Sequence, residues 1–138
     1  MKYIKKELDI QIRFADVDIL GHVNNVNLQH YFDLGKNTYF RDVMHTGLIW
    51  RELGIITAAT DTSYLAQTRL TDNIYVETAV EKIGTKSITV FQRILSRDTE
   101  EVRAESRSVM VAFDFERQVS IPVPEKWKKA LEEAGTTK

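Results

Sequence analysis

One short run of this chain brings together several side chains that could do acid, base or nucleophilic chemistry. It contains two carboxylates, one imidazole and two amides. A carboxylate can attack or deprotonate, an imidazole exchanges a proton near neutral pH, and an amide can hold water or a carbonyl group. We call this run the motif loop and interpret it as an active-site loop; its residues are Arg13-Phe14-Ala15-Asp16-Val17-Asp18-Ile19-Leu20-Gly21-His22-Val23-Asn24-Asn25.

The patterns on either side predict a strand before the motif loop and a helix after it. Alternation of apolar and polar residues from Glu7 to Phe14 is typical of a strand with one buried face. Apolar residues then recur every three or four positions from Leu28 to Val43, which predicts a helix of about four turns. We expect this helix to end near His45-Thr46-Gly47, with Gly47 as the left-handed residue that follows it. The motif loop would then lie at a helix start, where backbone N–H groups lack partners.

The polar residues of the motif loop each allow a structural and a chemical interpretation. Asp16 and Asp18 would project to the same side of an extended segment, or one of them could cap the following turn. His22 could orient a water, bond a carbonyl oxygen or protonate a leaving group, and the motif context favours function over structure. Asn25 could hold a water or a carbonyl group, although capping is the better interpretation for at least one of Asn24, Asn25 and Asn27. His30 and His45 lack such a context and are interpreted as structural.

The remainder of the chain predicts one α+β domain over residues 1–138. Short polar links between the strands imply antiparallel hairpins, and the apolar helix needs burial against them. Gly35, inside that helix, predicts a close approach of another group, most simply tight packing against the sheet. The expected strands are residues 55–66, 74–83, 87–95 and 102–115, and a short C-terminal helix is expected over residues 125–134.

Composition narrows the classes of function. The chain has 138 residues, a formal net charge of −1 and no basic stripe, so nucleic acid is not an expected partner. No apolar run fits a secretory signal or a membrane span, and we expect a cytoplasmic protein without a membrane partner. The absence of cysteine excludes disulfides, Cys-type zinc sites and a thiol nucleophile.

Competing catalytic motifs are also absent from the sequence. It has no Gly-x-Ser-x-Gly elbow of the α/β-hydrolase type and no Gly-x-Gly-x-x-Gly or P-loop to cradle phosphates. Its histidines do not have zinc-ligand spacing, so no metal site is expected.

The motif loop and the element order resemble a known family. An aromatic-x-Asp-x-Asp-x-x-Gly-His-Val-Asn-Asn run, followed by a long apolar helix and then strands, resembles the hotdog-fold acyl-CoA thioesterases of the 4-hydroxybenzoyl-CoA thioesterase type. The resemblance extends from about Leu8 to Pro122. It implies a five-stranded antiparallel sheet wrapped around one long central helix, and a homodimer or homotetramer with active sites at the interface between protomers.

The resemblance also implies roles for individual residues. Asp18 matches the acidic residue that acts on the thioester, as nucleophile or general base, whereas Asp16 matches a structural position. N–H groups near Asn24, Asn25 and Val26 would stabilise the carbonyl oxygen as it gains negative charge. Expected contacts to the acyl group or its surroundings are Val23, Asn24, Val26, Tyr64, Leu65 and Thr68, although Tyr64, Leu65 and Thr68 could equally be ordinary core residues. Expected contacts to coenzyme A are Lys86 and Ser87, although Lys86 could also be an ordinary solvated lysine.

The expected activity is hydrolysis of an acyl- or aroyl-CoA thioester to a free acid and coenzyme A. No cofactor is expected, because coenzyme A is part of the substrate. Two alternatives stay open: a thioesterase of the same fold that acts on acyl-carrier protein, and a non-catalytic acyl-CoA binding protein. A hotdog dehydratase or hydratase is less favoured, because the Asp-x-Asn-Pro-x-His type of run is absent.

Overall fold

The structure is a computed structural model that describes residues 3–45, 49–50 and 53–136. A 3₁₀ turn, two α-helices and seven strands follow one another along the chain. In order they are β1 (Lys5–Ile10), the 3₁₀ helix η1 (Phe14–Asp16), α1 (Asn25–Met44), β2 (Ile49–Trp50), β3 (Leu53–Tyr64), β4 (Ile74–Ile83), β5 (Ser87–Ser96), β6 (Val102–Asp114), β7 (Val119–Ser120) and α2 (Glu125–Thr136).

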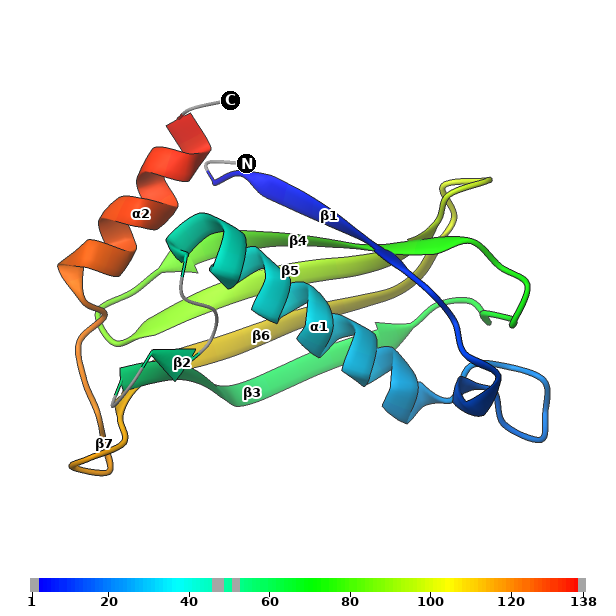
Figure 1. The fold of residues 1–138 in the computed structure, drawn as a ribbon, viewed down its shortest axis with the longest axis horizontal. Helices are drawn as coiled ribbons and strands as arrows, with labels where there is room; N and C mark the ends of the chain where they lie inside the picture. The colour runs from blue at the N-terminus through cyan, green and yellow to red at the C-terminus, as the bar shows by residue number, and fades with distance from the viewer. Residues whose placement is uncertain (1–2, 46–48, 51–52, 137–138) are drawn as a thin grey trace.

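The strands form one antiparallel sheet in the order β1-β4-β5-β6-β3-β2, and β7 pairs with β6. α1 lies across one face of this sheet, and α2 lies beside the C-terminal end of α1 (Figure 1). The α+β architecture and the five long strands confirm the prediction. The two-residue strands β2 and β7 were not predicted, because two residues are too short to show a period of two. None of the described helices is both long and apolar enough to cross a membrane.

Two apolar clusters form the core beneath α1. One lies toward the motif loop and includes Phe32, Val76 and Ile94. The other lies toward α2 and includes Tyr39 and Leu131. Both clusters are made by the apolar face of α1 and by alternating residues of the strands, as the periodicity predicts.

The prediction of a close approach at Gly35 is confirmed. A Cβ at this position would lie 2.7 Å from Val76 Cγ1 and 3.0 Å from both Gln92 Nε2 and Thr78 Oγ1. Such distances are shorter than ordinary van der Waals contacts, so α1 can lie this close to β4 and β5 only because residue 35 has no side chain.

Two local predictions were wrong, and a third, for Gly47, lies outside the described residues, although α1 ends next to His45 as predicted. β1 ends at Ile10 rather than Phe14, because the chain turns into η1, where Phe14 is 84% exposed. α1 has 20 residues, about five and a half turns instead of four. The left-handed residue after α1 is His45, with φ of 63°, whereas Thr46 and Gly47 lie outside the described residues.

Candidate active site

Asp16 is buried and fixes the start of the motif loop to α1. Its carboxylate accepts hydrogen bonds from the Arg13 N–H (3.1 Å), from Arg13 Nη2 (3.0 Å) and from the Tyr31 hydroxyl (2.6 Å). Its backbone carbonyl accepts from the Asn24 N–H (2.9 Å) and from Asn27 Nδ2 (3.2 Å). This geometry is that of a structural carboxylate, the role that the family resemblance implies.

The environment of Asp16 acts on its pKa in two opposite directions. Burial raises the pKa, but the hydrogen bonds from Tyr31 and Arg13 favour the charged form more strongly and hold the pKa below its ordinary value of 3.8. The pKa of Tyr31 is raised, mainly because its hydroxyl group is buried and secondly because it donates a hydrogen bond to Asp16. Tyr31 was predicted only as a core residue of α1. Its contact with a polar residue could have been expected from the sequence, because a tyrosine on the buried face of a helix needs a hydrogen-bond partner for its hydroxyl group.

Asp18 lies in a tight turn that leaves most of its carboxylate unengaged. Its Oδ1 accepts the Leu20 N–H at 2.9 Å, its N–H donates to the His22 carbonyl at 3.0 Å, and its carbonyl accepts the Gly21 N–H at 2.9 Å. Gly21 has φ of 84°, a left-handed conformation that favours glycine. Because η1 and this turn replace an extended segment, the prediction that Asp16 and Asp18 project to the same side was wrong.

The helix start offers fewer open N–H groups than the sequence suggested. Asn24 is the N-cap of α1: its Oδ1 accepts the Val26 N–H at 2.8 Å, and its own N–H donates to Asp16. The predicted capping role is therefore confirmed for Asn24, and the expected use of the Asn24 and Val26 N–H groups for an oxyanion was wrong. Among the described residues, the Asn25 N–H has no acceptor, so it is the group at the helix start that remains open.

The C-terminal half of the motif loop is attached to the segment that follows β3. The Val23 N–H donates to the Thr68 carbonyl at 2.7 Å, and Val23 forms a bridge with Val17. Arg103, a buried residue of β6, donates through Nη1 to the Gln67 carbonyl (2.8 Å) and to Asp72 Oδ2 (2.6 Å). Arg103 was not among the predicted site residues. Its partners Gln67 and Asp72 are more than 30 residues away, and no local sequence pattern links them.

The other predicted contact residues near the motif loop differ in exposure. Val23 is buried and packs in the apolar cluster, and its expected contact with substrate stays a prediction. Thr68 is also buried, and among the described residues its Oγ1 has no hydrogen-bond partner. In contrast, Tyr64 and Leu65 are about half exposed and are not core residues. His22 is partly buried and Asn25 is exposed.

Within one chain, the expected coenzyme A contacts lie far from the motif loop. Lys86 and Ser87 are at the turn between β4 and β5, whereas β4 begins at Ile74, which pairs with Ile10 just before the motif loop. The turn and the motif loop therefore lie at opposite ends of the sheet (Figure 1). Lys86 and Ser87 can meet Asp18 only if they come from a second protomer.

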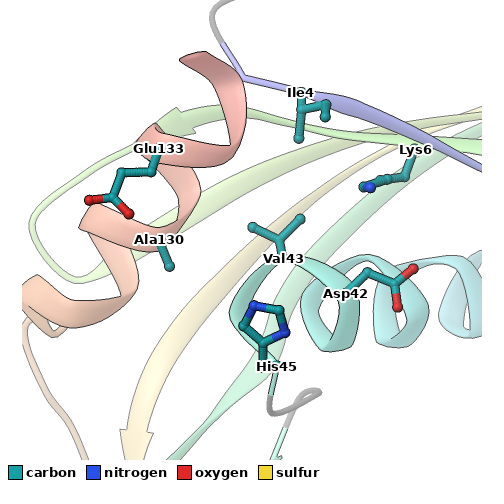
Figure 2. A pocket seen from close by; sticks show the side chains of 7 residues that line it. All are labelled: Ile4, Lys6, Asp42, Val43, His45, Ala130 and Glu133. Carbon is teal, nitrogen blue, oxygen red and sulfur yellow. The ribbon is translucent and has the colours of Figure 1, made fainter. Parts of the chain in front are cut away.

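Two pockets flank α1. One of about 290 Å³ lies behind the motif loop; it is lined by Asp9, Ile10, Gln11, Arg13, Asp16, His30, Tyr31 and Leu34. Figure 2 shows the other, of about 370 Å³, at the C-terminal end of α1; it is lined by Ile4, Lys6, Asp42, Val43, His45, Ala130 and Glu133. His30 and His45, which were predicted to be structural, are both exposed, one at each of these pockets.

Among the described residues, no group of three His, Asp or Glu side chains is arranged to hold a metal ion.

Comparison with known proteins places this chain among thioesterases. The family model of the thioesterase-like superfamily matches residues 12–131. No curated protein matches the chain. Because the family match spans most of the chain and includes all of the motif loop, it covers the candidate site as well as the sheet.

Solved structures share the fold. A predicted thioesterase from Bacillus stearothermophilus has 25% identity and a TM-score of 0.85, over 95% of this chain and 96% of its own. A Pseudomonas aeruginosa protein has 24% identity and a TM-score of 0.85, over 96% and 92%. A Thermus thermophilus thioesterase, solved with coenzyme A and zinc, has 23% identity and a TM-score of 0.83, over 96% and 95%. Together with the family match, these likenesses mean that the chain belongs to the thioesterase-like superfamily and is a hotdog-type thioester hydrolase.

Proposed function

We propose that the protein hydrolyses acyl-CoA thioesters at Asp18. The observation that carries this proposal is the state of the Asp18 carboxylate. Its Oδ1 is oriented by the Leu20 N–H, while its Oδ2 has no partner among the described residues, so one oxygen is positioned and the other is free to react. The coenzyme A bound to the Thermus thermophilus neighbour supports coenzyme A as the leaving group.

In the proposed reaction the thioester carbonyl lies between Asp18 and the first residue of α1. The Asn25 N–H, at the positive end of the helix dipole, donates to the carbonyl oxygen as it gains negative charge. The C–S bond breaks, and the departing coenzyme A thiolate takes up a proton. His22, on the same turn as Asp18, orients the attacking water or supplies that proton. No cofactor beyond the coenzyme A of the substrate enters this scheme.

Asp18 can begin the reaction in two ways. As a nucleophile it forms a mixed anhydride that water then hydrolyses, and as a general base it deprotonates a water that attacks the carbonyl. Repeated turnover in ¹⁸O-labelled water separates them. In the nucleophilic route, attack of water on Cγ of Asp18 in the anhydride places ¹⁸O in the Asp18 carboxylate, which mass spectrometry of the peptide detects. The general-base route labels only the released acid, so label in Asp18 identifies the nucleophilic route.

The activity test measures thiol release from acyl-CoA esters of short, long and aromatic acyl groups, with matched acyl-carrier-protein esters alongside. We expect turnover of CoA esters that is lost in Asp18→Asn. Faster turnover of the carrier-protein esters would favour the alternative acyl-carrier-protein thioesterase. Saturable binding of the CoA esters with no thiol release would instead indicate a non-catalytic binding protein and contradict the proposal.

The proposal includes a homodimer, or a dimer of dimers, with sites shared between protomers and each sheet wrapped around its own α1. β3 supports it: β2 covers only Leu53 and Gly54, so the exposed residues 57–61 form an open sheet edge. Apolar side chains are also exposed around Asp18: Phe14, Ile19, Leu20, Val26, Tyr64 and Leu65. In such an assembly, Lys86 and Ser87 of one protomer reach the coenzyme A held at the other protomer's motif loop, while Tyr64, Leu65 and Thr68 line the acyl group.

We also propose that the protein is located in the cytoplasm.

Sedimentation at micromolar and nanomolar concentrations, with activity assays on the same samples, tests the assembly. We expect activity to fall wherever the dimer dissociates. A monomer that keeps full activity would contradict the shared site.

A further inference from the structure

A row of polar side chains crosses the sheet under α1, between the two apolar clusters. The strand register places Thr78 of β4 opposite Gln92 of β5, Gln92 opposite Ser106 of β6, and Ser106 opposite Thr62 of β3. Thr78, Gln92 and Ser106 are each at most 2% exposed. The row therefore interrupts the core at its middle, where periodicity alone would favour hydrocarbon.

The outer part of this row, toward β3, lies beside further polar residues, and together they form two neighbouring hydrogen-bonded groups that we call the polar belt. Gln29 Nε2 donates to Thr62 Oγ1 (2.8 Å), which lies 2.9 Å from Ser106 Oγ. Ser108 Oγ lies 3.2 Å from Thr60 Oγ1 and accepts from Lys36 Nζ at 3.3 Å. The polar belt consists of Gln29, Lys36, Thr60, Thr62, Ser106 and Ser108.

Lys36 is the charged residue of the polar belt, and its side chain is 3% exposed. An ammonium group can donate three hydrogen bonds. Among the described residues, Lys36 Nζ has two polar neighbours, Ser108 Oγ and Asp33 Oδ1, each at 3.3 Å. The Asp33 side chain is 65% exposed, so water screens this pair. A buried ammonium with a hydroxyl group and a screened carboxylate retains the capacity to bind another acceptor.

Stability does not explain the burial of Lys36, Ser106 and Ser108; of the other belt residues, Gln29 and Thr62 are partly buried and Thr60 is exposed. Polar groups taken out of water gain little net free energy even when they are hydrogen-bonded, and apolar side chains of similar size would pack at least as well. One atom at the inner end of the row has no partner among the described residues, Gln92 Oε1. A cluster with these properties is suited to meet a polar ligand.

The polar belt begins close to the proposed reaction centre. Gln29 is four residues, about one helical turn, after Asn25, and its Nε2 also lies 3.1 Å from the Tyr64 hydroxyl. Lys36 is on the same helix face two turns later, about 16 Å along the axis from Asn25. An acyl group attached to a carbonyl at Asn25 and directed along α1 toward β3 would therefore pass over the polar belt.

We propose that the polar belt is the acyl-binding surface and selects acyl groups that carry a carboxylate or hydroxyl substituent over plain hydrocarbon chains. This inference rests on the proposed function. A hydrocarbon chain would offer no acceptor to Lys36 and would take water away from Thr60, which is exposed, and Thr62, which is partly exposed. A carboxylate or hydroxyl group would supply hydrogen bonds to these groups instead. Lys36 would bind the carboxylate, and Thr62 with Ser106 would bind a hydroxyl group.

The first experiment compares kcat/KM for two matched pairs of substrates with the unaltered protein. The pairs are glutaryl-CoA against pentanoyl-CoA, and 3-hydroxybenzoyl-CoA against benzoyl-CoA. We expect the polar member to be favoured by about tenfold or more in at least one pair, and the pair in which this occurs identifies the substituent. If both hydrocarbon members are hydrolysed as well as their polar counterparts, thioesterase activity stands and the inference is overturned. If no CoA ester is hydrolysed, both fail.

The second experiment assigns the preference to the polar belt. Lys36→Met keeps a long side chain but removes the charge, and we expect it to reduce the ratio of glutaryl to pentanoyl activity to about one. Ser106→Ala should do the same for the hydroxybenzoyl pair. Lys82→Met, an exposed position on β4, is the matched control and should leave both ratios unchanged. If both belt variants fold, as judged by circular dichroism, and keep the wild-type ratios, the assignment to the belt is wrong.

Discussion

Asp16 and Asp18 are two residues apart, yet their environments are opposite. Asp16 is 1% exposed and accepts three hydrogen bonds through its side chain, from Arg13 twice and from Tyr31. Asp18 is partly exposed and accepts one, from Leu20 in its own turn. A buried carboxylate that accepts three hydrogen bonds stabilises the fold and has little acceptor capacity left, whereas one that is held at a single oxygen keeps its other oxygen open. Environment, not residue type, separates the two aspartates, and it is the reason that the proposed function places the reaction at Asp18.

The strongest test of this comparison is Asp18→Asn. An amide keeps the size of the side chain but can neither attack a thioester nor deprotonate water, so we expect kcat to fall by at least about a hundredfold. The melting temperature should stay within a degree or two of wild type, because the lost group makes one exposed hydrogen bond. Steady-state kinetics and thermal denaturation of the same preparation measure both quantities.

Asp16→Asn should show the reverse pattern. It leaves Arg13 and Tyr31 without a charged acceptor in a buried position, so we expect the free energy of unfolding to fall by about 2 kcal/mol, as measured by urea denaturation. If Asp16→Asn and Asp18→Asn reduce kcat equally at unchanged stability, the assignment of roles is wrong.

His22→Ala should have a smaller catalytic effect than Asp18→Asn. Orienting a water or protonating the thiolate is secondary when the helix start already stabilises the carbonyl oxygen, so we expect a loss of about tenfold in kcat. Complete loss of turnover in His22→Ala, alongside retained turnover in Asp18→Asn, would reverse the two roles.

The smallest effect concerns acid stability. The pKa of Asp16 is lower in the folded state than its ordinary value of 3.8, so its stabilising contribution is complete above that value and is lost as pH falls below it toward the folded-state pKa. The difference in unfolding free energy between wild type and Asp16→Asn should therefore shrink between pH 5 and pH 2. Urea denaturation across this range measures it, and a difference that is independent of pH would contradict the ionised state of Asp16.

The sequence predicts the elements of this fold well and the contacts of its site only in part. The bounds of β4 match the prediction at both ends, because clear turn signals on both sides of a mostly apolar run define where the strand begins and ends. The motif loop was located correctly, but η1 was not predicted, because a 3₁₀ turn has no hydrophobic period of its own. The Asp16–Tyr31 hydrogen bond, the Arg103 contacts and the polar belt join residues that are distant in sequence. Such contacts depend on strand register, which no local pattern specifies.

Gly35 has a consequence for how the protein can move. The helix backbone meets Val76 and Gln92 at this point, and Gln92 Nε2 donates to the Phe32 carbonyl at 2.8 Å. A helix held by close packing on one side and by a hydrogen bond to its own backbone can neither slide along its axis nor roll on the sheet without losing both. α1 is therefore a fixed support for the motif loop that precedes it.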